Sequence, residues 1–252
     1  MSEPLLQVVG LTKRFGGVVA ADAINLDIAR GEFHAVIGPN GAGKTTLISL
    51  LAGEIAPQSG TIRFDGVDIT ALPDHRRSSL GVARSFQITS LFSDFTALDN
   101  VALAAQAHTG HSFRFWQDVR HDEPLRQQAH AALTRVGLAE RAGMRIDKLS
   151  HGEHRQIEIA MALATRPRML LLDEPMAGMG PEESARMVAM LRELKGNLTI
   201  LLIEHDMETV FALADRITVL VYGRIIASGD PAAVRADAAV REAYLGKQKA
   251  RA

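Results

Sequence analysis

The chain has 252 residues, 47% of them hydrophobic, which is enough for one packed domain with a smaller lobe. Its 28 Lys and Arg residues nearly balance 29 Asp and Glu residues, so the net charge of −1 excludes a global basic field that recruits nucleic acid. The absence of cysteine excludes disulfides and cysteine metal sites and suits a reducing cytosol. We expect no signal peptide, because the first residues show no basic segment followed by an apolar run. We expect no membrane span, because no apolar stretch approaches the roughly 20 residues that cross a bilayer.

The first 70 residues have the pattern of short strands around one glycine-rich loop. Apolar runs bounded by turn residues predict strands at 5–9, 24–28, 33–37, 61–64 and 67–69. Asp65-Gly66 separates the last two runs and is a hairpin signal. A loop at 38–43 follows the third strand, and a helix is predicted from Lys44.

The middle of the chain, from 96 to about 165, has a helical pattern. Thr96 with Asp99 three residues later is typical of a helix start, and Asp122-Glu123-Pro124 places acids and proline at another. Residues 109–122 lack a clear periodicity and are predicted to be a surface loop. We expect a helical lobe at about 90–160.

Strand patterns return in the last third of the chain. An apolar run at 169–172, a helix that opens at Pro181 and ends near Gly196, and a run at 198–203 predict a parallel sheet. Tyr222-Gly223 joins two further runs in a late hairpin, predicted at 217–221 and 224–227.

The glycine-rich loop fits the phosphate-binding pattern G-x-x-x-x-G-K-[ST] over Gly38–Thr45. Its glycines let backbone N–H groups point at phosphate oxygens, and the following helix adds its positive N-terminal end. Lys44 is expected to reach the β- and γ-phosphates, and the Thr45 hydroxyl to bind Mg²⁺. The nucleotide-binding residues predicted here are Gly38, Asn40, Gly41, Ala42, Gly43, Lys44, Thr45 and Thr46.

Two carboxylates follow the apolar run 169–172. Burying acids at the end of such a strand is costly unless they serve a cation or a water. Asp173 can therefore hold the Mg²⁺ shell, and Glu174 can polarise the attacking water. His205 follows the neighbouring strand, which would deliver it beside the γ-phosphate, although a lone histidine is usually structural.

A second anion site is predicted far from the first. Ser150 and Gly152 stand at the start of a helix, more than 100 residues after the phosphate loop. Taken alone, they are more typical of an ordinary capped helix than of an anion site. Two phosphate sites in one chain indicate that ATP is shared between two chains, each of which contributes one half.

In order, these segments resemble the ATP-binding subunit of ABC transporters, from about Leu6 to Gly246. The corresponding motifs are the phosphate loop Gly38–Thr45, the magnesium aspartate Asp173, the catalytic glutamate Glu174, the signature Leu149–Glu153, the glutamine-loop residue Gln87, the switch histidine His205 and the adenine-stacking Phe15. The resemblance implies catalytic roles for Glu174, His205 and Lys44. It also implies that Thr45, Gln87 and Asp173 hold Mg²⁺.

The resemblance implies an α/β fold: a P-loop ATPase core with a parallel sheet, an antiparallel β subdomain and an inserted α-helical subdomain. It would form a single domain over residues 1–252, with a C-terminal tail from about 228. The expected partners are transmembrane permease subunits, a second ATP-binding subunit that is identical or paralogous, and indirectly a periplasmic binding protein. No nucleic acid is expected. Such a subunit is cytoplasmic and peripheral on the inner face of the cell membrane.

Within that family, the chain is most similar to the branched-chain amino acid uptake group. The supporting segments are 15–20, the long helical insert after Leu103, and the end from Asp230-Pro231 to Tyr244-Leu245-Gly246. The signature usually reads Leu-Ser-Gly-Gly-Gln and here contains His151 and Glu153; because bulky residues occur at the third place in this group, we expect activity. The loop after Pro175 usually ends in Asp or Asn, whereas here it leads to Gly180.

The segment after Gln87 carries apolar residues that a permease helix could contact in this family. Phe92 and Phe95 are expected to form an exposed patch, the alternative being that they pack inside the lobe.

Three other functions remain open at this point. A lipopolysaccharide-exporting transporter subunit resembles the chain closely. A soluble relative that acts on ribosomes or DNA would resemble two fused cassettes or carry coiled-coil inserts, and this chain has neither. A P-loop kinase or nucleotide switch would leave Leu149–Glu153 and His205 without roles.

Overall fold

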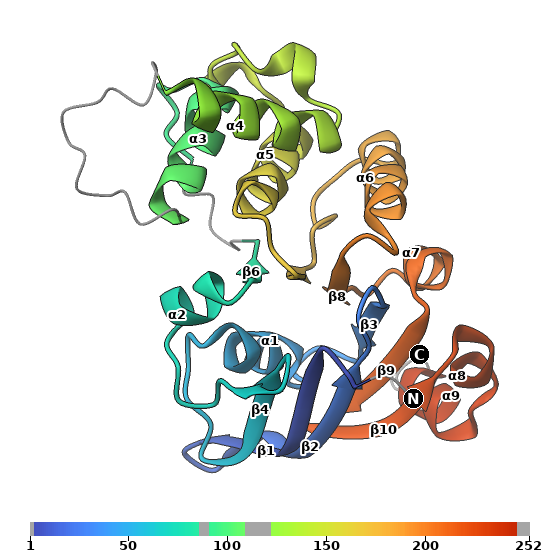
Figure 1. The fold of residues 1–252 in the computed structure, drawn as a ribbon. Helices are drawn as coiled ribbons and strands as arrows, with labels where there is room; N and C mark the ends of the chain where they lie inside the picture. Colours follow the sequence, from blue (N-terminus) through green and yellow to red (C-terminus); the bar gives the residue numbers. More distant parts are fainter. Residues whose placement is uncertain (1–2, 86–90, 109–121, 246–252) are drawn as a thin grey trace. The chain divides into compact units, whose positions relative to one another are not determined.

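The structure is a computed structural model that describes residues 3–85, 91–108 and 122–245. Its strands are β1 (Leu6–Phe15), β2 (Val18–Ile28), β3 (Phe33–Ile37), β4 (Ser59–Phe64), β5 (Val67–Asp68), β6 (Val82–Arg84), β7 (Met169–Asp173), β8 (Thr199–Ile203), β9 (Arg216–Val221) and β10 (Arg224–Gly229) (Figure 1). Its α-helices are α1 (Lys44–Ala52), α2 (Asp74–Ser79), α3 (Ala97–His108), α4 (Glu123–Arg135), α5 (His151–Ala164), α6 (Pro181–Leu194), α7 (Met207–Leu213), α8 (Pro231–Ala236) and α9 (Ala238–Leu245). Two short 3-10 turns, η2 (Ala139–Arg141) and η3 (Ile146–Lys148), precede α5.

The chain forms two compact units. Unit 1 comprises Met1–Arg77, Leu171–Glu174 and Lys195–Ala252, and unit 2 comprises Ser78–Leu170 and Pro175–Leu194. The boundary crosses β7, whose first two residues belong to unit 2 and whose last three belong to unit 1.

Two sheets build the structure. An antiparallel sheet has the order β2-β1-β4-β5, and a mixed sheet has the order β10-β9-β3-β8-β7-β6. In the mixed sheet, β3 runs parallel to both β8 and β9, and β10 pairs antiparallel with β9. The predicted α/β fold with a parallel sheet is therefore confirmed, and so is the late hairpin that turns at Tyr222-Gly223.

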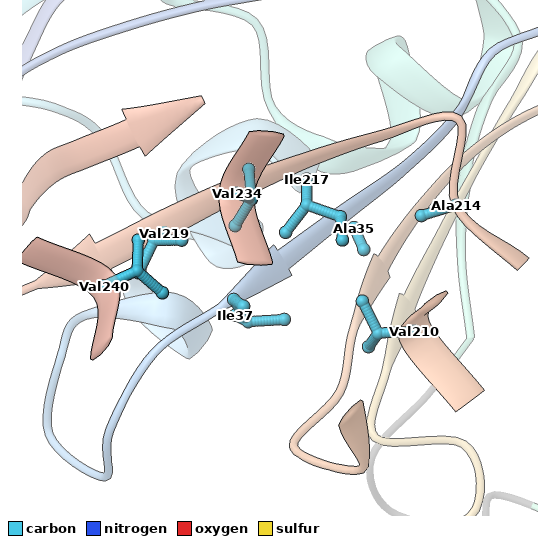
Figure 2. Close-up of a cluster of buried hydrophobic side chains, with 8 residues drawn as sticks. All are labelled: Ala35, Ile37, Val210, Ala214, Ile217, Val219, Val234 and Val240. Carbon is cyan, nitrogen blue, oxygen red and sulfur yellow. The ribbon is translucent and has the colours of Figure 1, made fainter. Parts of the chain in front are cut away.

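The mixed sheet is buried at its centre. Every residue of β3, β7 and β8 is buried, as expected of parallel strands that are covered on both faces. In unit 1, apolar side chains from β3 and β9 pack against α7, α8 and α9 (Figure 2). This cluster consists of Ala35, Ile37, Val210, Ala214, Ile217, Val219, Val234 and Val240. It fixes the strand that leads directly into the phosphate loop.

The helices α3, α4 and α5 of unit 2 pack on one another. Their starts follow the capping residues in the sequence. The Thr96 hydroxyl accepts a hydrogen bond from the Asp99 amide, and the Asp122 carboxylate accepts one from the Leu125 amide. Ser150 caps α5. The predicted helix starts are confirmed, whereas the loop predicted at 109–122 lies almost entirely outside the described residues.

Some predicted boundaries are wrong. β1 continues to Phe15 and β2 begins at Val18, although strands were predicted only at 5–9 and 24–28. The cause is an irregularity near Gly10, which has φ 60° and donates its N–H to Asn25 Oδ1 at 2.9 Å. The strand pair bends there and resumes, so the turn-like residues mark a bulge.

Candidate nucleotide-binding site

The phosphate loop in unit 1 requires glycine at two positions. A Cβ atom at Gly38 would lie 2.1 Å from the Leu220 carbonyl oxygen, and one at Gly43 would lie 2.1 Å from the Ala20 carbonyl oxygen. Gly43 also has φ 103°. The loop therefore packs directly on the backbones of β2 and β9, and this packing holds its own backbone in place.

The start of α1 offers its amides to a ligand. Gly43 occupies the N-cap position in a left-handed conformation, and no side chain within the described part of the chain caps this end. Lys44 is 6% exposed, and its ammonium group donates to the carbonyl oxygens of Gly38 at 2.8 Å and Pro39 at 3.2 Å. Thr45 is exposed beside it. Uncapped amides and a positive helix end make a suitable cradle for phosphate.

The opposite end of α1 is anchored by Arg77, which sequence reasoning missed. This side chain is 1% exposed, and its guanidinium donates to the carbonyl oxygens of Leu50 and Leu51 at 2.7 and 2.9 Å. It also donates to the carbonyl oxygens of Leu72 and Thr70. Burial lowers the pKa of Arg77 to about 10. A cation at this end complements the helix dipole and satisfies the terminal carbonyls.

The strand ends of unit 1 bring the acids and the histidine to one edge of the sheet. β3 and β8 are parallel, with Val36 level with Ile203. The Glu174 amide donates to the Ile203 carbonyl oxygen at 2.9 Å, which aligns the end of β7 with the end of β8. The phosphate loop, Asp173-Glu174 and His205 all follow these strand ends. Carboxyl ends of parallel strands are the usual position of ligand sites in such folds.

Asp173 and Glu174 have different surroundings. Asp173 is 5% exposed, whereas the Glu174 side chain is 39% exposed. Glu174 adopts φ 47°, a left-handed conformation that costs a non-glycine residue about 1 kcal/mol. The exposed His205 ring places its Nδ1 atom 3.9 Å from Glu174 Oε1 and 3.5 Å from Oε2 of the buried Glu204.

Of the remaining residues predicted in this half, Phe15 lies at the end of β1 and is 50% exposed. The Lys13 ammonium lies 5.4 Å from the centre of its ring. Thr46 is half-buried in the first turn of α1. Gln87 lies outside the described residues.

The second predicted anion site lies in unit 2, at the start of α5. The Ser150 hydroxyl accepts a hydrogen bond from the Glu153 amide at 3.2 Å, and the Glu153 carboxylate accepts one from the Ser150 amide at 2.7 Å. The two residues therefore form a capping box. The other oxygen of Glu153 lies 3.4 Å from Nε of Arg141, which offsets its charge. Gly152 is buried, and His151 is exposed beside Gly178.

A pocket of about 730 Å³ lies at this end of α5. It is lined by α5, by the turn that contains η2 and by the start of α6. Its charged lining residues are Glu140, Arg141, Glu153, Glu183 and Arg186. The Ser150 hydroxyl donates to Glu183 Oε1 at 3.2 Å. Arg141 and Glu183 were not singled out from the sequence because neither belongs to the signature motif, and only folding brings the turn with η2 and the start of α6 to it.

The residues of unit 1 fit a nucleotide with a divalent cation. The uncapped amides of α1 and the two glycines that a Cβ would crowd form the phosphate cradle. The exposed Thr45 hydroxyl and the Asp173 carboxylate are hard oxygen donors of the kind that Mg²⁺ prefers.

Comparisons with known proteins agree with this geometry. Residues 21–177 match the family model described as ABC transporter. The chain therefore belongs to the ABC transporter family, as its ATP-hydrolysing cassette. Residues 224–250 match a second family model, described as branched-chain amino acid ATP-binding cassette transporter.

Two relatives cover the chain almost completely. The high-affinity branched-chain amino acid transport ATP-binding proteins BraF of Pseudomonas aeruginosa and LivG of Escherichia coli K12 are each 40% identical, over 98% of this chain and 100% of the relative. A crystal structure of the ADP conformation of an ABC transporter cassette superimposes with a TM-score of 0.86 at 29% identity, covering 97% of this chain and 100% of that one. A nucleotide-free cassette gives a TM-score of 0.85 at 29% identity, covering 96% and 98%.

Proposed function

We propose that this chain binds ATP together with Mg²⁺ at its phosphate loop and hydrolyses it to drive amino acid import through a membrane permease. One observation carries the proposal. At a single edge of the sheet in unit 1, the uncapped start of α1 lies with the Asp173-Glu174 pair and with His205. Phosphate binding, a metal ligand and a base for water are the parts that phosphoryl transfer to water requires.

Each side chain of this edge has a proposed task. Lys44, which now bonds to carbonyls of its own loop, would turn to the β- and γ-phosphates. Thr45 and Asp173 would hold Mg²⁺, with Gln87 as a further ligand. When bound, Mg²⁺ supplies positive charge that offsets the phosphate oxygens. Phe15 would stack on adenine, since its ring is half exposed.

Glu174 is the proposed base that orients and polarises the attacking water. Its left-handed backbone turns it out of the strand, and its partial exposure leaves room for that water. His205 lies 3.9 Å from Glu174 and would hold the terminal phosphate in position relative to that carboxylate. The short distance between the two side chains supports a shared task.

A second ATP-binding subunit, identical or paralogous, is the proposed partner. Ser150 and Gly152 of one chain would complete the phosphate loop of the other, because unit 2 presents a helix start with a serine hydroxyl and a pocket beside it. Hydrolysis would remove the phosphate that both chains hold, and the dimer would open.

Import of branched-chain or related small amino acids is the proposed transport. The relatives BraF and LivG are named for this uptake, and the C-terminal family match supports it over lipopolysaccharide export. Transmembrane permease subunits and, indirectly, a periplasmic binding protein would be the partners, with this chain on the cytoplasmic face. Within the part of the chain that the structure describes, none of the helices has the length and apolar character of a bilayer span.

Phe92 and Phe95 are the proposed docking patch for the permease. Phe92 is 58% exposed, and the two ring centres lie 5.4 Å apart. The buried Asn100 side chain bonds to both the amide and the carbonyl of Phe92, so the segment is held in shape without burying the ring. The Phe92 ring is exposed and the Phe95 ring beside it is half-buried, and an aromatic ring held in this way suits an interface anchor.

The test of hydrolysis is Glu174→Gln, with Glu182→Gln as the matched control, because Glu182 is an exposed acid on α6. We expect retained ATP affinity by calorimetry and a 10²- to 10⁴-fold loss of phosphate release, the usual effect of losing a general base. ATP should then hold a dimer that size-exclusion chromatography detects. Turnover within about twofold of the control would remove Glu174 from this role.

The transport proposal is tested by ATP-dependent uptake of radiolabelled leucine, isoleucine and valine through the reconstituted permease. The docking patch is tested separately with Phe92→Glu. This variant should keep the ATPase activity of the isolated chain and abolish its association with the permease. If the variant loses activity or unfolds on its own, Phe92 belongs to the core and the docking patch lies elsewhere.

A further inference from the structure

The carboxylate of Glu183 lies against the start of α5 within unit 2. Glu183 is in the first turn of α6, and its Oε1 accepts the Ser150 hydroxyl at 3.2 Å. Its Oε2 accepts the Gly180 amide at 3.4 Å. A Cβ atom on Gly152 would lie 2.8 Å from Oε1, so the glycine leaves the space that this carboxylate occupies.

This contact uses the hydrogen that an anion at Ser150 would need. The Ser150 hydroxyl has one proton and donates it to Glu183, while its oxygen accepts the Glu153 amide. A phosphate oxygen can bind this hydroxyl only after the carboxylate has left. Glu183 therefore competes with any incoming anion for the same donor.

The charge of Glu183 strengthens the competition. Glu153 is offset by Arg141, whereas the structure records no cation within ion-pair distance of Glu183 among the described residues. Arg186 and Arg141 also line the pocket, but Glu140 lies there with them. A carboxylate and a phosphate cannot both occupy this helix end, because like charges at such distances repel strongly.

We propose that Glu183 keeps the Ser150–Gly152 site closed in the free chain and is the group that the terminal phosphate of a nucleoside triphosphate, held by a second copy, must displace. The inference rests on the proposed function. It makes Glu183 a residue that sets the ATP concentration at which two chains associate, since part of the phosphate's binding free energy is used to move the carboxylate.

The test measures ATP-driven dimerisation by analytical ultracentrifugation in the Glu174→Gln background, which lacks turnover. Glu183→Gln keeps the shape of the side chain and removes its charge. Glu182→Gln, in the same first turn, removes an exposed charge that no recorded contact links to Ser150. We expect Glu183→Gln to lower the ATP concentration for half-maximal dimerisation about tenfold relative to Glu182→Gln, the usual effect of one charge-assisted hydrogen bond.

A second measurement tests the closed contact without a dimer. Hydrogen exchange of the nucleotide-free chain should be faster in the peptide that contains Gly180 for Glu183→Ala, and unchanged for Glu182→Ala, because Gly180 loses its acceptor. Equal exchange in both variants, or equal ATP requirements in the two glutamine variants, would overturn the inference while leaving the proposed ATPase intact. If the Glu174→Gln parent forms no dimer with ATP, the proposed shared site fails, and the inference fails with it.

Discussion

Replacing Gly43 with alanine tests whether the phosphate loop is held by its packing on β2. The new Cβ would lie 2.1 Å from the Ala20 carbonyl oxygen, whereas ordinary contacts begin near 3.4 Å. The backbone of β2 would have to move by about 1 Å, which typically costs 1–3 kcal/mol. The φ of 103° adds a further 1–2 kcal/mol of strain for a residue with a Cβ.

Gly41→Ala is the matched comparison in the same loop. Gly41 has φ 78°, but a Cβ there would meet nothing within 4 Å. Its strain of about 1 kcal/mol is largely offset by the lower entropy of the unfolded chain. We therefore expect Gly41→Ala to change the free energy of unfolding by less than about 1 kcal/mol and Gly43→Ala, after the same entropic offset, to lower it by about 2–4 kcal/mol.

The assay is urea unfolding of the nucleotide-free chain, followed by calorimetric titration with ATP. Gly43→Ala should also bind ATP more weakly, because a displaced loop no longer directs its amides inward. Equal unfolding free energies for the two variants, within about 1 kcal/mol, would refute the argument that contact with Ala20 sets the loop.

Three further predictions concern charge. Lys44→Ala should weaken ATP binding at least about tenfold by calorimetry, and unchanged affinity would contradict its phosphate role. Arg141→Gln should weaken ATP-driven dimerisation because it removes the positive charge that offsets the Glu153 carboxylate. The double variant Arg141→Gln/Glu153→Gln should restore dimerisation. Burial raises the pKa of Glu158 above 4.5, so the native chain keeps a proton that the unfolded chain has released, and stability falls as pH rises from 4.5. When the free energy of unfolding is measured in urea from pH 4.5 to 8, Glu158→Gln should reduce its fall with rising pH. An unchanged fall would show that Glu158 does not cause it.

The sequence predicted the long buried elements well because their signals are local. The strand 33–37 is a continuous apolar run next to a glycine loop, and the structure gives it the same bounds. Helices that start at a capping residue, such as α5 after Ser150, were also predicted. The short helices α2, α7, α8 and α9 were missed because they span only six to eight residues and depend on contacts with distant elements. Such contacts are the apolar cluster for α7, α8 and α9 and the Arg77 hydrogen bonds for α2.

For the site, the sequence predicted motifs but not the groups that hold them. Arg77 lies 25 residues or more from α1, and nothing in the pattern links a surface-type residue to the carbonyls at the end of that helix. The Glu174–His205 distance likewise depends on the pairing of β7 with β8. Predicting such contacts between distant parts of the chain requires the order of the strands in the sheet, which the spacing of apolar residues does not reveal.

The two departures in the signature have different physical consequences. At position 153 the capping box needs only an oxygen acceptor, which glutamate provides as glutamine would, and Arg141 offsets the additional charge. At position 151 the side chain projects from the first turn of α5, while the capping contacts come from Ser150 and Glu153. Neither substitution therefore removes a donor from the helix end. The group that does occupy a donor is Glu183, outside the signature, so the control of this site depends on α6 more than on the unusual signature residues.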